Sequence, residues 1–439
     1  MIEHAPKISD VNLPQAISFL LNPKNKDLLN KIDENYLYWD KVKYLAPDGV
    51  EPETLWHAVK LQRSANQTTI KFGNYKFRFT ITGKMQRLLH EFDMDFGGNL
   101  GSDSIIPAQN AHGYLLSSIM EEAIASSQME GASTTRKVAK EMLRKKAKPI
   151  GKSQQMILNN YMTIRYLVNN KDKGFSIEEL KHIHELISRK TLDNPEDEGR
   201  FRRDDNIYVV NSLNGEIAHT PPEAAKLDQL VGELCDFANH DSSNPFVHPI
   251  VKGIFLHFLL AYFHPFVDGN GRTARSLVYW YLIKQGYWLT EYLSISRAIY
   301  KSKARYENSF LYAELDDLDI SYFINYNLEA MQKAYIDLKE YLQRKTAEQD
   351  AIYELRKLQD INDRQAQIVK MLKDKPTSFF TANEMMLRFS VSEKTARSDL
   401  RGLVSMGLME ERPINKRKSG FSRTDDFERK LDELLHHKG

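Results

Sequence analysis

The chain has 439 residues, enough for two or three domains that each bury a core. Its 61 Lys and Arg residues nearly balance 59 Asp and Glu residues, so the net charge of +2 neither indicates nor excludes a nucleic-acid partner. The single cysteine, Cys235, excludes an intrachain disulfide and a cysteine zinc cluster, and we expect it to be a buried thiol. Because no signal-peptide pattern or bilayer-length apolar run is present, we expect a cytoplasmic protein without membrane association.

Residues 1–105 are predicted to form an N-terminal extension. Apolar residues recur at helical spacing over residues 13–62, which predicts helices around an aromatic core of Trp39, Tyr44 and Trp56. Alternation over residues 69–82, around Gly73-Asn74, predicts a small hairpin, and residues 97–107 read as a loop.

A run of helices follows, predicted at about residues 114–128, 135–145, 153–169 and 177–189. Ser176 with Glu179 three residues later is a capping box that announces the last of them. His182 and His184 fall within that helix and are expected at its surface.

Residues 204–219 interrupt the helical period. Strand-like residues on both sides of Asn214-Gly215 predict a hairpin, and its first strand includes Ile207, Tyr208, Val209 and Val210. Thr220-Pro221-Pro222-Glu223 is expected to begin the next helix. Further helices are predicted up to a charged helical connector at residues 346–363.

Residues 364–439 have the pattern of three short helices followed by a wing. Residues 391–423 carry eight basic against four acidic residues, a local excess of four positive charges. This segment looks like a winged helix, with residues 392–406 as its recognition helix. The residues that would contact DNA are Lys394, Arg397, Arg401, Lys416, Arg417 and Lys418.

The densest chemistry lies in His264-Pro265-Phe266-Val267-Asp268-Gly269-Asn270-Gly271-Arg272-Thr273-Ala274-Arg275. Helical sequence on both sides makes this stretch a loop that opens a helix, where unpaired N–H groups suit an anion. The loop is not a dinucleotide fingerprint, because a helix rather than a strand precedes it, and the glycine spacing is too short for a Walker A loop. A phosphate-handling site remains. His257, seven residues before His264 and on about the same helical face, is expected to be a core histidine, with a second ligand as the alternative.

This loop resembles the Fic family, whose pattern H-x-F-x-D/E-G-N-G-R-x-x-R is met at every specified position. The resemblance covers roughly residues 106–345 and also includes Gly199-Arg200-Phe201-Arg202 and the 204–219 hairpin. It implies a mainly α fold, with a Fic-type helical core, a β-hairpin flap and, at the C-terminus, a winged helix-turn-helix domain. It also implies a bacterial-type nucleotidyltransferase that moves AMP from ATP to a Tyr, Thr or Ser hydroxyl of a target protein.

Residue chemistry agrees with these implied roles. His264 has the pKa to accept the proton of an attacking hydroxyl. Asp268 can hold Mg²⁺ against the phosphates. The nucleotide-binding set is Gly269, Asn270, Gly271, Arg272 and Arg275, with Asn270 and Arg272 also expected to act in catalysis and Phe266 as a buried anchor. The flap is expected to dock an extended segment of the target by strand addition.

Ser126-Ser127-Gln128-Met129-Glu130-Gly131 fits the family's inhibitory pattern S/T-x-x-x-E-G/N. Ser126 and Glu130 lie on one helical face, and Gly131 is a natural helix stop. The resemblance implies a helix at about residues 114–130 that inhibits the enzyme by pairing Glu130 with Arg275. Alternative functions are removal of AMP from a modified protein, with Glu130 positioning water, and a DNA-binding regulator whose Fic core senses nucleotide. Self-modification and a homodimer stay open.

Overall fold

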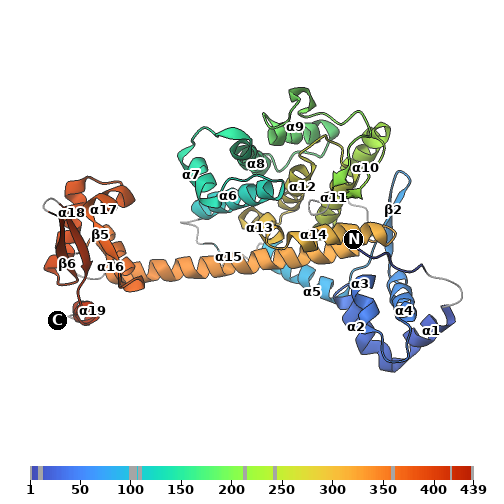
Figure 1. Cartoon of the computed structure of the whole chain (residues 1–439), viewed down its shortest axis with the longest axis horizontal. Coiled ribbons are helices and arrows are strands. Elements are labelled where there is room, and N and C mark those ends of the chain that lie inside the picture. The colour runs from blue at the N-terminus through green and yellow to red at the C-terminus, as the bar shows by residue number, and fades with distance from the viewer. Residues whose placement is uncertain are drawn as a thin grey trace. The chain divides into compact units, whose positions relative to one another are not determined.

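The structure is a computed structural model that describes residues 2–7, 13–97, 106, 111–210, 215–240, 245–356, 361–415 and 418–436. The chain forms two compact units, Met1–Leu338 and Lys339–Gly439. Both are dominated by helices with only small sheets, which confirms the mainly α prediction (Figure 1). Within the described ranges, no helix combines the length and apolarity needed to cross a bilayer.

The N-terminal part of the first unit contains five helices and one hairpin. They are α1 (Leu13–Leu21), α2 (Lys26–Glu34), α3 (Trp39–Val42), α4 (Pro52–Ser64), β1 (Thr68–Phe72), β2 (Tyr75–Phe79) and α5 (Gly83–Phe92), with short helical turns at Pro23–Asn25, Lys43–Leu45 and Asp93–Gly97. Trp39 and Trp56 are buried as predicted, but the prediction for Tyr44 is wrong because its side chain is 77% exposed. Tyr44 follows the end of α3, and its ring faces the Lys43 ammonium instead of the core.

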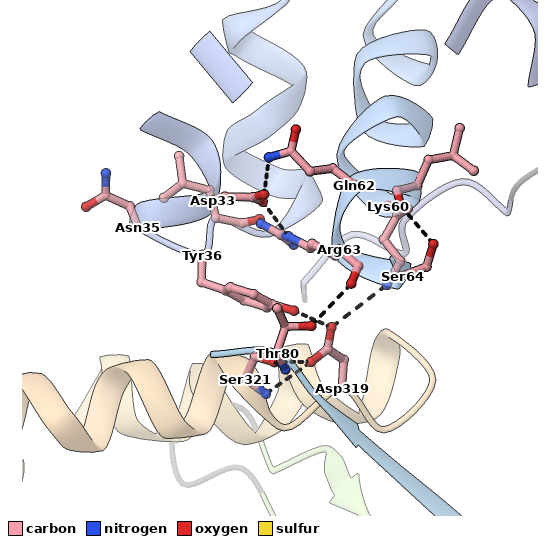
Figure 2. Close-up of polar contacts among 12 residues, drawn as sticks. Asp33, Asn35, Tyr36, Lys60, Gln62, Arg63, Ser64, Thr80, Asp319 and Ser321 are labelled. Carbon is pink, nitrogen blue, oxygen red and sulfur yellow. Dashed lines mark hydrogen bonds and ion pairs between the residues drawn. The ribbon is translucent and has the colours of Figure 1, made fainter. Parts of the chain in front are cut away.

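The Figure 2 network fixes these helices to the turn between α14 (Lys303–Leu315) and α15 (Ser321–Arg356). The buried Arg63 donates to Asp33 Oδ1 at 2.9 Å and to the Tyr322 hydroxyl at 3.0 Å. Tyr36 donates to Asp319 Oδ2 at 2.7 Å. Asp319 is fully buried and lies beyond α14, so the extension supports the far end of that helix.

The rest of the first unit is a helical core around α11 (Pro249–Phe263) and α12 (Asn270–Lys284), which lie against each other and are buried along most of their length (Figure 1). The surrounding elements are α6 (Ala111–Met129), α7 (Arg136–Lys145), α8 (Gly151–Asn169), α9 (Ile177–Ser188), β3 (Val209–Val210), β4 (Ile217–His219), α10 (Leu227–Asn239) and α13 (Ile295–Tyr300), with 3-10 turns at Pro195–Asp197, Ala224–Lys226 and Trp288–Tyr292. A helix that is apolar all round belongs inside a fold, which explains why α11 is central. Cys235 is buried, and burial raises the pKa of its thiol to about 12.

The flap hairpin is present, but its strands are shorter than predicted. Val209 pairs with His219 and Val210 with Ile217, whereas Ile207 and Tyr208 precede the strand. The tip, residues 211–214, lies outside the described residues.

The helix after the flap does not begin at Thr220 as predicted. A 3-10 turn starts at Ala224 and leads into α10. Asp205 Oδ1 accepts the Ala224 N–H at 2.7 Å, and Arg202 donates to the Pro222 carbonyl. These contacts hold residues 220–223 in an extended connection.

The second unit contains the predicted helix-turn-helix with its wing. Its elements are α16 (Asp363–Asp374), β5 (Phe379–Thr381), α17 (Ala382–Phe389), α18 (Glu393–Ser405), β6 (Met409–Asn415), β7 (Lys418–Arg423) and α19 (Phe427–His436), and the strand order is β5-β7-β6. Its apolar core includes Leu400, Leu403 and Phe421. α15 continues to Arg356 and so forms most of the predicted connector as helix.

Candidate active site

Two residues with positive φ bound the loop between α11 and α12. His264 ends α11 at φ +46°, and Gly269 precedes α12 at φ +84°. Phe266 is fully buried, as expected of an anchor. Asn270 Oδ1 accepts the Phe266 N–H at 2.9 Å, and its Nδ2 donates to the Phe266 carbonyl at 2.8 Å. The Asn270 amide therefore shapes the loop, which differs from the expected direct contact with phosphate.

His264 has the orientation of a general base. Its Nδ1 lies 3.3 Å from the Ala261 carbonyl, so Nδ1 carries the proton and Nε2 is the nitrogen that can accept one. Burial lowers the pKa of His264 to about 4. The ring is therefore neutral near pH 7, as a base must be before it acts.

Arg272 presents donors that the fold leaves unpaired. The side chain is completely buried, and Nη1 donates to the Ile187 carbonyl at 3.2 Å. Nε and Nη2 have no hydrogen-bond partner among the described residues, and Nη2 lies 3.8 Å from Asp268 Oδ1. Burial lowers the pKa of this guanidinium. Since unpaired buried donors are costly, this site fits an anion such as a phosphate group.

The first turn of α12 adds a second anion-binding feature. Its leading N–H groups have no acceptor within the helix. A Cβ at Gly271 would overlap Glu130 Oε1, so only glycine allows an oxyanion to approach this turn so closely. In this structure the oxyanion is the Glu130 carboxylate.

Arg275 is held by the end of α6. Its Nε donates to Ser126 Oγ at 2.9 Å, and Nη2 donates to Ser126 O at 2.9 Å and to Glu130 Oε1 at 2.8 Å. Burial is the largest single effect on Glu130 and acts to raise its pKa, but the charge and hydrogen bond of Arg275, together with the charges of Arg272 and Lys303, outweigh burial and lower the pKa overall. Glu130 is therefore an ionised carboxylate. Gly131 has φ +90° and ends the segment, as expected.

A cavity of about 480 Å³ opens above these groups. The loop of residues 264–275, called the catalytic loop below, forms the floor of the cavity together with the end of α6. The flap strands form one side and α14 forms another. Its lining includes Glu130, Val209, His219, His264, Gly271, Arg275, Lys303, Tyr306 and Glu314. The structure thus gathers the predicted base, the predicted inhibitory glutamate and two of the predicted nucleotide-binding residues, Gly271 and Arg275, at one cavity. His257 is buried below it, with Nε2 2.9 Å from the Tyr306 hydroxyl, as expected of a core histidine.

Asp268 fits the predicted metal role. Its side chain is half exposed, and Oδ1 accepts the Gly269 N–H at 2.5 Å. Among the described residues, no group of three His, Cys, Asp or Glu side chains is arranged as a metal site. One carboxylate beside a phosphate site suits Mg²⁺, which prefers few protein ligands and takes the rest from phosphate and water.

His184 was missed, because the prediction that it lies at the surface is wrong. Its ring is fully buried and stacks on Phe266, with centroids 3.7 Å apart. Nδ1 accepts the Gly199 N–H at 3.0 Å, so Nε2 is the donor to the Asp268 carbonyl, 2.8 Å away. His184 therefore fixes the Asp268 backbone. Its lowered pKa, about 4, follows from burial.

Arg202 supports the loop from the flap side. Its N–H donates to the Pro265 carbonyl at 2.8 Å and its Nε donates to the His264 carbonyl at 3.0 Å. Because its other donors reach Asp204, Asp205 and Pro222, this residue joins both ends of the flap to the catalytic loop. The sequence analysis noted Gly199-Arg200-Phe201-Arg202 as part of the family resemblance but did not predict that Arg202 supports the loop.

Glu122 was also missed. It lies one turn before Ser126 on α6 and is buried. It accepts from the Tyr279 hydroxyl at 2.7 Å and from the Ser296 N–H at 2.9 Å. Burial raises the pKa of this carboxyl. Glu122 therefore anchors α6 to α12 and α13.

Several of the other predicted residues are exposed. Tyr208, Val210 and Ile217 of the flap are 45%, 52% and 59% exposed, so the flap presents an apolar face. On α18, Lys394 is exposed, while Arg397 pairs with Glu393 and Arg401 with Glu411. Lys416 and Arg417 lie outside the described residues, and Lys418 begins β7.

Comparison with known proteins agrees with this geometry. Residues 174–282 match the Fic/DOC family, and residues 364–412 match the DeoR-like helix-turn-helix domain. The protein adenylyltransferase Fic of Drosophila mojavensis is 37% identical over 110 residues, which are 25% of this chain and 20% of that protein. The protein of the same name from Culex quinquefasciatus is 31% identical over 118 residues, 27% of this chain and 21% of that protein. The chain thus spans about a fifth of the length of these relatives.

One solved structure extends the likeness in fold. A Fic family protein from Desulfovibrio desulfuricans G20 aligns over 79% of this chain and 97% of its own, with a TM-score of 0.50 and 20% identity. The chain thus contains a region, residues 174–282, that matches the Fic/DOC family and carries the complete loop pattern at residues 264–275, and a C-terminal region, residues 364–412, that matches the DeoR-like helix-turn-helix domain.

Proposed function

We propose that this chain transfers AMP from ATP to a hydroxyl group of a target protein and that Glu130 restrains the reaction. The observation that carries the proposal is that one loop and the helix start after it hold the neutral His264, the unpaired donors of Arg272 and the glycine-containing first turn of α12. The adenylyltransferase names of the relatives support the same reaction class.

The proposed reaction gives each of these groups one role. The target hydroxyl attacks the α-phosphorus of ATP while His264 Nε2 accepts its proton. The new P–O bond joins AMP to the target, the bond between the α- and β-phosphates breaks, and pyrophosphate leaves. Arg272 and the first N–H groups of α12 stabilise the phosphate charge. Mg²⁺ held by Asp268 would neutralise part of the charge on the leaving phosphates.

The restraint follows from shared donors. Glu130 occupies Arg275 and the space above Gly271, both of which the triphosphate needs. ATP therefore binds in its productive position only after Glu130 leaves. The flap edge at Val209 and Val210 supports docking of an extended target segment by strand addition.

Incubation of a cell lysate with ATP labelled in its α-phosphate tests the proposal. We expect Glu130→Gly to label protein and His264→Ala to label none. Release of AMP from modified protein by the same variants would instead favour the reverse reaction. An equal signal from the His264→Ala and Glu130→Gly variants would reject AMP transfer by this site.

A second function is proposed for the C-terminal unit. The DeoR-like match and the exposed cationic residues of α18 support DNA binding. A gel shift with the full chain should weaken steeply with salt and on replacement of Arg397 and Arg401. A chain that shifts DNA and represses transcription regardless of His264 would favour the regulator hypothesis.

A further inference from the structure

His219 is the last residue of β4, and it connects the flap to two walls of the cavity. Its Nε2 lies 2.7 Å from the Tyr262 carbonyl near the end of α11. Its Nδ1 lies 2.8 Å from Glu314 Oε2 on α14. The side chain is only 8% exposed, so solvent competes little for either contact.

Both ring nitrogens of His219 have a polar partner. A backbone carbonyl can only accept, so Nε2 donates to the Tyr262 carbonyl. Nδ1 lies against the carboxyl group of Glu314. Because both contacts are shielded from solvent, together they hold the ring in one orientation.

The two contacts fix the flap relative to the catalytic base. Tyr262 lies two residues before His264 on the same chain segment. On its other side, His219 pairs with Val209, the first residue of the strand whose edge faces a target. One side chain thus sets the distance between the docking strand and the base.

Glu314 is itself anchored from behind. Asp316, two residues later, pairs with Lys60 Nζ at 2.8 Å and accepts from the Tyr322 hydroxyl at 2.8 Å. Asp319 accepts from Tyr36 and Ser321 in the network of Figure 2. The N-terminal helices therefore fix the end of α14, which lets Glu314 hold His219 in one place.

We infer that His219 is a positioning residue that keeps the flap strand in register with His264, so that a bound segment presents its hydroxyl to the base. The inference rests on the proposed AMP transfer for its kinetic consequence, but the contacts that carry it do not depend on that reaction. It assigns the N-terminal extension a part in target positioning through α14.

The kinetic test uses the full chain with Glu130→Gly as the active parent. We expect His219→Ala to lower kcat/KM, measured on the protein that the labelled-ATP lysate assay identifies, by about thirtyfold, the effect of removing one partner of a buried hydrogen-bonded pair. ATP affinity, measured with a fluorescent ATP analogue, should change by less than about twofold because no phosphate donor is altered. Glu314→Ala should give the same loss, and the double variant little more.

The controls separate positioning from general damage. Glu223→Gln removes an exposed pair with Lys226 just beyond the flap and should leave kcat/KM unchanged. Glu314→Gln retains an acceptor for Nδ1 and should recover part of the loss. Equal kcat/KM in parent and His219→Ala would overturn the inference, as would a parallel loss of ATP affinity.

Amide hydrogen exchange gives a readout that does not require AMP transfer. In His219→Ala, the amides of β3 and β4 should exchange about tenfold faster, while those of α12 should not change. Unchanged flap exchange would overturn the inference. A parent that binds ATP but modifies no protein would instead refute the proposed function, and exchange alone would then judge the role of His219.

Discussion

Replacing Glu130 tests the restraint at its contact with Arg275. The charged groups lie 2.8 Å apart, and the side chains of Arg275 and Glu130 are 4% and 30% exposed. Removing one partner of a buried pair typically costs about 3 kcal/mol or more. In Glu130→Gly, ATP no longer has to displace the contact between Glu130 and Arg275. The free energy of productive ATP binding therefore becomes more favourable by about 3 kcal/mol, which corresponds to about a hundredfold in affinity.

Glutamine at the same position refines the magnitude. Glu130→Gln keeps an oxygen acceptor for Arg275 but loses the charge, and a neutral hydrogen bond contributes about 1 kcal/mol. The remaining difference of about 2 kcal/mol predicts an increase of about thirtyfold. The order of activity should therefore be Glu130→Gly, Glu130→Gln, then the unaltered chain.

The assay is the initial rate of protein-bound AMP formation at ATP concentrations below saturation. Glu121→Gln is the matched control, because Glu121 lies on the same helix but pairs with Arg136 and Lys140. Equal rates for Glu130→Gly and the unaltered chain, with the His264-dependent signal intact, would refute the restraint. So would an equal rise in Glu121→Gln.

Three further changes probe the site and its support. Burial lowers the pKa of His264 from 6.5 to about 4, so the neutral base form persists as the pH falls. The activity of Glu130→Gly should therefore stay level from pH 7.5 to 5.5 in a pH-rate profile. With an unperturbed histidine as base, the activity would fall about tenfold over the same range. His184→Ala leaves the Asp268 carbonyl and the Gly199 N–H unpaired, so it should raise the Mg²⁺ concentration needed for half-maximal activity. His184→Gln should raise that concentration less. The same half-maximal Mg²⁺ concentration in His184→Ala and in its parent would contradict the role of His184 in fixing Asp268. Arg63→Met leaves the Asp33 carboxylate without its buried cation and should lower the unfolding free energy by about 3 kcal/mol in urea titration, whereas the surface change Arg87→Met should have little effect.

Short-range sequence patterns predicted the loop and most helices because their determinants lie within a few residues. The spacing from His264 to Arg275 places the whole phosphate site in one turn and one helix start. Ser176 caps α9 by accepting the Glu179 N–H as predicted, although the Glu179 side chain binds Tyr166 and Lys173 and does not complete a capping box. These features need no knowledge of the rest of the fold.

The supporting residues were missed because their partners are distant backbone atoms. His184 reaches the Asp268 carbonyl across 84 positions, and Arg202 reaches the His264 carbonyl across 62. A carbonyl has no sequence signature, so spacing cannot reveal such contacts. Glu122 did leave a signal, since a carboxylate four residues before Ser126 shares the face that bears Glu130.

The proposed restraint by Glu130 and the proposed phosphate binding use the same donors, so a variant that lacks one donor cannot distinguish the two roles. Arg275 serves Glu130 now and would serve a phosphate later, and Gly271 gives both oxyanions the same approach. Release must therefore come from movement of the carboxylate. Glu122 ties α6 to its neighbours, whereas Glu130 lies one residue beyond the helix end, beside Gly131 at φ +90°. Rotation of the partly exposed Glu130 side chain can thus release the Arg275 Nη2 contact and the space above Gly271 while α6 and its Ser126 contacts to Arg275 stay in place.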